Sequence, residues 1–125
     1  MMNATASILS LVLLLLNGPP PAIEIQWLDP TTYDFGDIPK GQPVETAFRF
    51  QNRGDQPLII DNVRPSCGCT TPEWPRGVIL PDSSAAIRVA YSAGTPGPFK
   101  KLIKVYFDGQ RRAERLYLEG VVIAP

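Results

Sequence analysis

Proline is the residue that most restricts what this chain can fold into. It occupies 14 of the 125 positions, about twice its usual share of ~5%. Because proline lacks a backbone N–H and its ring clashes inside a helix, it is excluded from helix interiors and from central strands. The chain must therefore contain many turns and sheet edges.

The hydrophobic residues after position 22 alternate with period two, and no segment shows the 3.6-residue period of a helix. The clearest strand is residues 44–51, in which Val44, Phe48 and Phe50 alternate with polar neighbours. Further strands are predicted in residues 23–27, 58–63, 87–91, 102–107 and 116–122. Prolines and glycines separate these predicted strands. Together, the two features predict an all-β fold, an immunoglobulin-like antiparallel β-sandwich of about seven strands.

The N-terminal residues have the pattern of an export segment. Residues 8–16 read ILSLVLLLL, which is shorter than the about 20 residues that span a bilayer and matches the apolar part of a signal peptide. No Lys or Arg precedes the run and no A-x-A site follows it, so an uncleaved anchor is an alternative, as is a buried first element. We predict that residues 1–22 are a signal peptide or N-terminal anchor with a Pro-rich spacer, and that residues 23–125 form the domain.

This segment predicts an exported protein of the periplasm or cell envelope. Its only membrane contact would be residues 8–16, if they are retained.

The charges of the chain cancel overall but are unevenly distributed. Twelve basic residues balance twelve acidic ones, with an acidic first half and a basic second half. A balanced chain without a known binding motif is not expected to bind nucleic acid. Either solvated outer faces of two strands or a binding patch would explain the cluster of bases near the C-terminus. This cluster consists of Lys100, Lys101, Lys104, Arg111, Arg112 and Arg115.

The sequence offers little for catalysis. It has no histidine, which removes the side chain best suited to proton transfer near neutral pH and the commonest metal ligand. The Ser-His-Asp and Cys-His arrangements are therefore impossible. Met1 and Met2 are the only methionines and precede the apolar run. We expect no catalytic residue, no cofactor and no enzyme activity.

Cys67 and Cys69 are the one pair of residues for which we consider a metal-binding or redox role. In an extended segment, residues two apart point to the same face, so the thiols converge. They would form a structural pair between sheets, hold a metal with ligands from a second chain, or form a small-ring, easily reduced disulfide suited to thiol–disulfide exchange. Paired cysteines of exported proteins are most often structural. Exchange chemistry favours a nearby cation, and the nearest in sequence are Arg64 and Arg76.

Two further motifs have plain structural explanations. Asp34-Phe35-Gly36 has the letters of the kinase metal-binding triplet, but the chain lacks the other kinase motifs. We expect a buried Phe35 followed by a glycine bend. Trp74 is either a surface anchor or, as we expect, an aromatic that covers the edge of the core.

Several strings in this order resemble a known family of bacterial exported proteins. The strings are YDFGDIPKG (33–41), FRFQNRG (48–54), PLIIDNVRPSCGCTTPEWP (57–75), GPFKKLIKVYFDG (97–109) and LEGVV (118–122). They are similar to the family catalogued as domain of unknown function fifteen seventy-three, which is grouped with the major-sperm-protein-like and ASPM/SPD-2/hydin domains. Asp82 departs from the family's usual glycine at a turn. The resemblance implies an immunoglobulin-like fold and an envelope location, but no activity.

These observations lead to two hypotheses for the function. The first is a non-catalytic binding or structural module whose partner is an envelope protein or a glycan. The second is a thiol-dependent role of Cys67 and Cys69 in metal handling or disulfide exchange.

Overall fold

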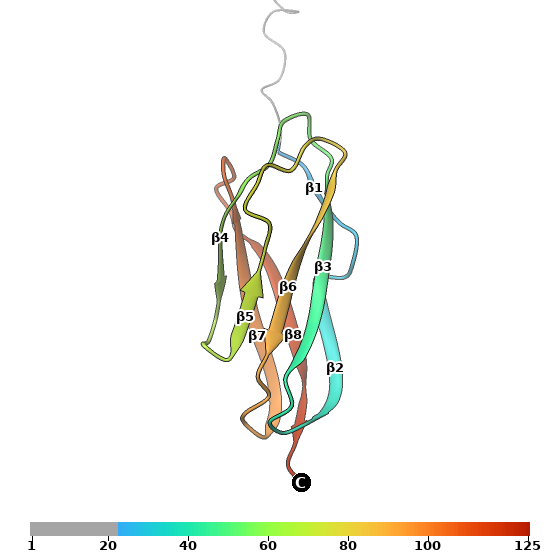
Figure 1. The fold of residues 1–125 in the computed structure, drawn as a ribbon, viewed down its shortest axis with the longest axis vertical. Helices are drawn as coiled ribbons and strands as arrows, with labels where there is room; N and C mark the ends of the chain where they lie inside the picture. The colour runs from blue at the N-terminus through green and yellow to red at the C-terminus, as the bar shows by residue number, and fades with distance from the viewer. Residues whose placement is uncertain (1–22) are drawn as a thin grey trace, which may run out of the picture.

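The computed structural model describes residues 23–125, which form two four-stranded sheets packed face to face (Figure 1). These residues contain eight strands and no helix, and the strands run along the length of an elongated sandwich. The predicted signal or anchor and its spacer, residues 1–22, lie outside the described residues. The strands are β1 (Ile25–Trp27), β2 (Thr32–Pro39), β3 (Val44–Asn52), β4 (Ile60–Pro65), β5 (Thr70–Glu73), β6 (Ser84–Tyr91), β7 (Gly97–Phe107) and β8 (Glu114–Ile123).

The first sheet has the order β1-β3-β6-β5, and all its neighbouring strands are antiparallel. β3 and β6 form its centre, with Phe48 opposite Ile87. The alternation predicted for residues 44–51 is confirmed, because Phe48 and Phe50 are buried while Arg49 between them is exposed. Period-two patterning therefore assigns the inner and outer faces of this sheet correctly.

The second sheet has the order β2-β8-β7-β4 and contains one parallel pair. β7 and β8 form a long hairpin, closed by the predicted turn at Asp108 and Gly109 and a loop that continues to residue 113. β2 runs parallel to β8, whereas we predicted an antiparallel sandwich of about seven strands. Because β2 enters this sheet from β1 in the other one, no hairpin fixes its direction.

β2 is bent where the Asp34-Phe35-Gly36 motif lies. Gly36 has a φ of +68°, and the register of β2 against β8 shifts between Asp34 and Asp37. The Gly36 N–H donates to Asp34 Oδ1 at 2.8 Å, and Phe35 packs against the core while staying half-buried. The predicted glycine bend is thus a β-bulge in an edge strand, a common place for one.

A single hydrophobic core fills the space between the sheets. Phe50 of β3 joins the two layers, with its ring centroid 5.3 Å from that of Trp27 and 5.5 Å from that of Phe107 of β7. Trp74 packs against the core from its edge, as predicted. The buried members are Ile38, Phe48, Phe50, Leu58, Ile60, Val63, Ile79, Ile87, Val89, Tyr91, Ala93, Ile103, Val105, Phe107, Leu116, Leu118 and Val122.

The turn before β6 explains the glycine that the resembled family usually carries there. Asp82 has a φ of +66°, a left-handed conformation that glycine adopts freely and that aspartate tolerates better than most residues. Its N–H donates to the Asn52 carbonyl at 2.8 Å and its carbonyl accepts from Gln51 Nε2 at 3.0 Å.

Within residues 23–125, no helix is long and apolar enough to cross a membrane.

Candidate functional site

Cys67 and Cys69 lie where the chain crosses from one sheet to the other. β4 of the second sheet ends at Pro65, and β5 of the first sheet begins at Thr70. The tight turn between them brings the two Sγ atoms into contact, with the Cα atoms 5.3 Å apart. Figure 1 shows the turn that connects β4 and β5 at the edge of the sandwich. The two sulfurs converge as predicted, but through a tight turn at residues 66–69 and not through the extended segment from which we predicted it.

The two sulfurs lie close to the Thr70 hydroxyl, and the two arginines nearest in sequence face aromatic rings. Both cysteines are half-buried, and Thr70 Oγ1 lies 3.7 Å from Cys67 Sγ and 3.8 Å from Cys69 Sγ. The two cations named from the sequence face aromatic rings instead. Arg76 lies over the ring of Trp74 and Arg64 over that of Tyr106.

A metal at the two cysteines would need further ligands. Residues 23–125 contain no group of three or more His, Cys, Asp or Glu side chains placed to hold a metal ion. The two sulfurs would therefore supply at most half of a tetrahedral zinc site, with the rest coming from another chain. The metal-holding role of Cys67 and Cys69 stays a prediction.

A second candidate site covers the outer surface of the second sheet. Arg64 of β4 pairs in register with Lys104 of β7, which pairs in register with Arg115 of β8. Their neighbours Val63, Val105 and Leu116 are buried, so these three side chains point away from the core. The basic face, as we call this surface, consists of Arg64, Lys104, Tyr106, Arg111, Arg112, Arg115 and Tyr117.

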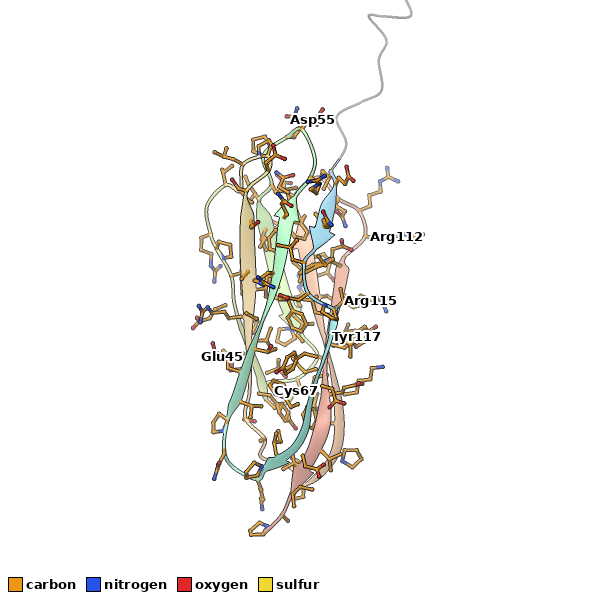
Figure 2. The ribbon with its side chains drawn as sticks, turned by 90° about the vertical axis from the view of Figure 1, so that its right-hand side faces the viewer. Glu45, Asp55, Cys67, Arg112, Arg115 and Tyr117 are labelled. Carbon is orange, nitrogen blue, oxygen red and sulfur yellow. A yellow bond between two sulfur atoms is a disulfide. The ribbon has the colours of Figure 1, made fainter. Side chains whose placement is uncertain are left out.

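Figure 2 shows how this face is oriented. Arg112, Arg115 and Tyr117 lie on the side of β8 that points away from the first sheet, while Glu45 lies on the opposite side of the sandwich. Two aromatic rings line the face beneath cations. The Arg64 guanidinium carbon lies 5.5 Å from the Tyr106 ring centroid, and Lys100 Nζ lies 5.0 Å from that of Tyr117.

Cations on the outer face of the first sheet are paired, in contrast to those of the basic face. Arg49 Nη2 lies 2.8 Å from Asp29 Oδ1, and Arg88 Nη1 lies 3.5 Å from Glu45 Oε1. Hydrogen bonds from the side chain and backbone of Arg49 lower the pKa of Asp29 to about 2. None of the five cations of the basic face forms an ion pair within residues 23–125.

The structure divides the basic cluster that the sequence singled out. Lys104, Arg111, Arg112 and Arg115 come together on the basic face. Lys101 is half-buried and lies on the same side of β7 as Phe99 and Ile103, the side that faces the core. Lys100 lies on the outer side but opposite Glu119. The sequence left open whether the cluster is a solvated face or a binding patch, and the outward position of its members other than Lys101 fits both explanations.

Sequence reasoning missed three members of the basic face. Arg64 joins it only through the pairing of β4 with β7, forty residues later in the chain. Tyr106 and Tyr117 were assigned to strands but not to a site. Residues two apart in a strand lie on the same face. The positions of Tyr106 and Tyr117, two residues after Lys104 and Arg115, could therefore have predicted that they join this face.

The model of the family described as "Protein of unknown function (DUF1573)" matches residues 26–122, nearly the whole described domain. The chain belongs to the DUF1573 family. The family resemblance noted in the sequence is thereby confirmed. A comparison with curated proteins found no match.

Solved structures share the fold of this DUF1573 domain. A protein of unknown function from Porphyromonas gingivalis W83 aligns with a TM-score of 0.65 at 20% identity, over 82% of this chain and 47% of that protein. This chain thus spans about half of its length. The PapD-like domain 7 of human CEP192 aligns with a TM-score of 0.67 at 13% identity, over 86% of this chain and 91% of that domain.

The secreted serine protease VesC from Vibrio cholerae contains a similar region, with a TM-score of 0.60 and 13% identity. That alignment covers 80% of this chain but only 23% of the protease. At these identities the likeness shows the fold alone. It confirms the predicted immunoglobulin-like sandwich.

Proposed function

We propose that this DUF1573 domain is a non-catalytic module of the cell envelope that binds another macromolecule through its basic face. The row formed by Arg64, Lys104 and Arg115 carries the proposal. Like charges placed directly opposite each other on neighbouring strands destabilise a sheet. No ion pair within residues 23–125 offsets this repulsion, and a role in binding is the simplest reason for the row.

The chemistry of the chain supports binding over catalysis. No histidine is present in the sequence, and the two cysteines are the only pair of reactive side chains that the described residues bring into contact. The apolar run at residues 8–16 supports export to the envelope. A β-sandwich with one charged outer face needs no further group in order to bind a partner.

Crosslinking from opposite faces of the sandwich tests this function. A photo-crosslinking amino acid replaces Leu102, which lies on the outer side of β7 beside the basic face, or Ala47, which lies on the outer side of β3. We expect irradiation of cells to give a discrete adduct from position 102 and none from position 47. Excess unlabelled domain should compete for the adduct. Adducts of equal yield from both positions, or none from either, would contradict the proposal.

The contact between Cys67 and Cys69 favours a second, thiol-based role. We infer that the two residues form a disulfide that fixes the crossover between the sheets. Their Cα separation of 5.3 Å lies within the range of disulfides, about 4.4–6.8 Å, and an oxidising compartment would maintain the bond. Metal binding by the reduced pair is the alternative that the following experiment distinguishes from a disulfide.

An intact mass of the protein from its native compartment checks the thiol inference. After denaturation in an alkylating agent, we expect no alkyl groups and a mass two hydrogens below that of the reduced chain. Reduction before alkylation should add two alkyl groups. Two alkyl groups without reductant, or a metal adduct that disappears on denaturation, would show that the disulfide is absent and favour the metal site.

A further inference from the structure

The cations of the basic face form no ion pair with any part of residues 23–125. Arg64, Lys104 and Arg115 lie on three adjacent strands, and neighbouring strands are about 4.8 Å apart. The row therefore spans about 10 Å across the sheet. Arg111 and Arg112 extend it at the tip of the β7–β8 hairpin.

Two open hollows flank the centre of this row. One, of about 600 Å³, is lined by Lys104, Tyr106, Arg111, Arg112, Ala113 and Arg115. The other, of about 300 Å³, is lined by Arg64, Pro65, Ser66, Leu102, Lys104 and Tyr106. Lys104 and Tyr106 belong to both hollows. A ligand lying across the strands would contact both hollows and all three cations of the row.

The residue types of the face identify the chemistry of the ligand. Four of its five cations are arginines, and the planar guanidinium binds carboxylates with two parallel hydrogen bonds. Tyrosine and arginine are enriched in the central contacts of protein–protein interfaces. Tyr106, half-buried under the Arg64 guanidinium, is placed to serve as such a central contact.

We propose that the basic face binds an extended, acidic segment of a partner protein, with its carboxylates on Arg64, Lys104 and Arg115. The proposal rests on the binding function proposed above and names the chemistry of the partner. Side chains on one face of an extended chain lie two residues, or about 6.6 Å, apart, so about five residues bring three carboxylates over the row, within reach of its long side chains.

Fluorescence anisotropy with a labelled hexaglutamate peptide tests the proposal on the full-length chain. The test variant combines Arg64→Gln, Lys104→Gln and Arg115→Gln. The control combines Lys40→Gln, Arg53→Gln and Arg88→Gln, which removes the same charge from exposed residues elsewhere. We expect affinity to fall about tenfold or more in the test variant and less than twofold in the control. Binding should also weaken with salt, because exposed charges are screened.

The melting temperature separates lost binding from lost structure. Because the row repels itself, the test variant should melt at the same temperature as the unchanged protein or higher. A test variant that melts well below the unchanged protein would show that the row stabilises the sheet and would overturn the argument.

Competition decides which polyanion fits the face. The competitors are a polygalacturonate oligomer, a single-stranded thymidine oligonucleotide of equal charge, and vesicles containing anionic lipid. If any of them binds through the face ten times more tightly than hexaglutamate, or if hexaglutamate shows no dependence on the face, the acidic-peptide assignment is wrong. Should a position-dependent adduct from residue 102 persist in that case, the binding function would still stand. If both experiments fail, both proposals fall.

Discussion

Replacing Asn52 by leucine should lower the free energy of unfolding by about 1–3 kcal/mol. Asn52 is completely buried at the end of β3. Its Nδ2 donates to the carbonyls of Gln56 at 2.8 Å and Ile79 at 3.0 Å, and its Oδ1 accepts from the Gly54 N–H at 3.0 Å. One side chain therefore satisfies three backbone groups of two different loops.

The size of this effect follows from comparing two opposing contributions. Each buried backbone group left without a partner costs about 1–3 kcal/mol. Burying a leucine side chain returns about 1.5–3 kcal/mol. The Ile79 carbonyl keeps its bond from the Leu58 N–H, so the substitution leaves two groups without a partner, the Gly54 N–H and the Gln56 carbonyl. Their combined cost exceeds the gain from one hydrophobic side chain, and the loss remains a substantial part of the about 5–15 kcal/mol that stabilises a typical domain.

Urea unfolding followed by the fluorescence of Trp27 and Trp74 would measure this loss. The midpoint should fall without a change in the slope of free energy against urea concentration. Asn62→Leu is the matched control, because Asn62 is half-buried and its Oδ1 accepts only the adjacent Val63 N–H. We expect the control to lose less than about 1 kcal/mol. An equal loss in both variants would mean that the Asn52 bonds do not hold the two loops together.

The strands that the sequence predicted are those with one face in the core and one in solvent. β3, β6, β7 and β8 each alternate between buried residues and half-buried or exposed ones over most of their length. The pleat of a half-buried strand imposes this period directly on the sequence. Local patterning was therefore sufficient for the central part of each sheet.

The strands that it missed are edge strands with an interrupted pattern. β2 carries the bulge at Gly36, which breaks the period of two halfway along the strand. β5 is four residues long and contains Pro72, which pairs with Val89. Proline argues against a strand except at an edge, and β5 is at an edge. That position follows from the whole sheet and cannot be read locally.

How well each candidate site could be predicted depended on how far apart its residues lie in the sequence. Cys67 and Cys69 are two residues apart, so their convergence is a local property of the chain. Four cations of the basic face lie close together on the β7–β8 hairpin, and the sequence grouped them. Arg64 joins them through a pairing between distant strands, and its contribution needed the structure.

Gly120→Val should be the other strongly destabilising substitution, with an expected loss of about 2–3 kcal/mol. Gly120 lies in β8 at the point where the β2 bulge and Phe99 approach it. A Cβ atom there would be 2.8 Å from the Gly36 carbonyl oxygen and 2.9 Å from Phe99 Cζ. Phe99 has little freedom to move away, because its ring stacks on that of Tyr91 with centroids 4.2 Å apart.

Valine at position 120 would therefore push β2 away from β8 at the bulge. Urea unfolding measures the loss, and hydrogen exchange should show faster exchange of the β2 amides that pair with β8. Gly77→Val is the control, because a Cβ at Gly77 would meet no atom within 4 Å, and its loss should stay below about 1 kcal/mol.

Phe99→Leu in the Gly120→Val background should recover part of the loss, since it makes room beside the new side chain but leaves the Gly36 carbonyl in place. If the double variant recovers nothing, the carbonyl contact with β2 alone sets the need for glycine. If Gly120→Val is as stable as the control, close packing at the bulge does not fix the parallel strand.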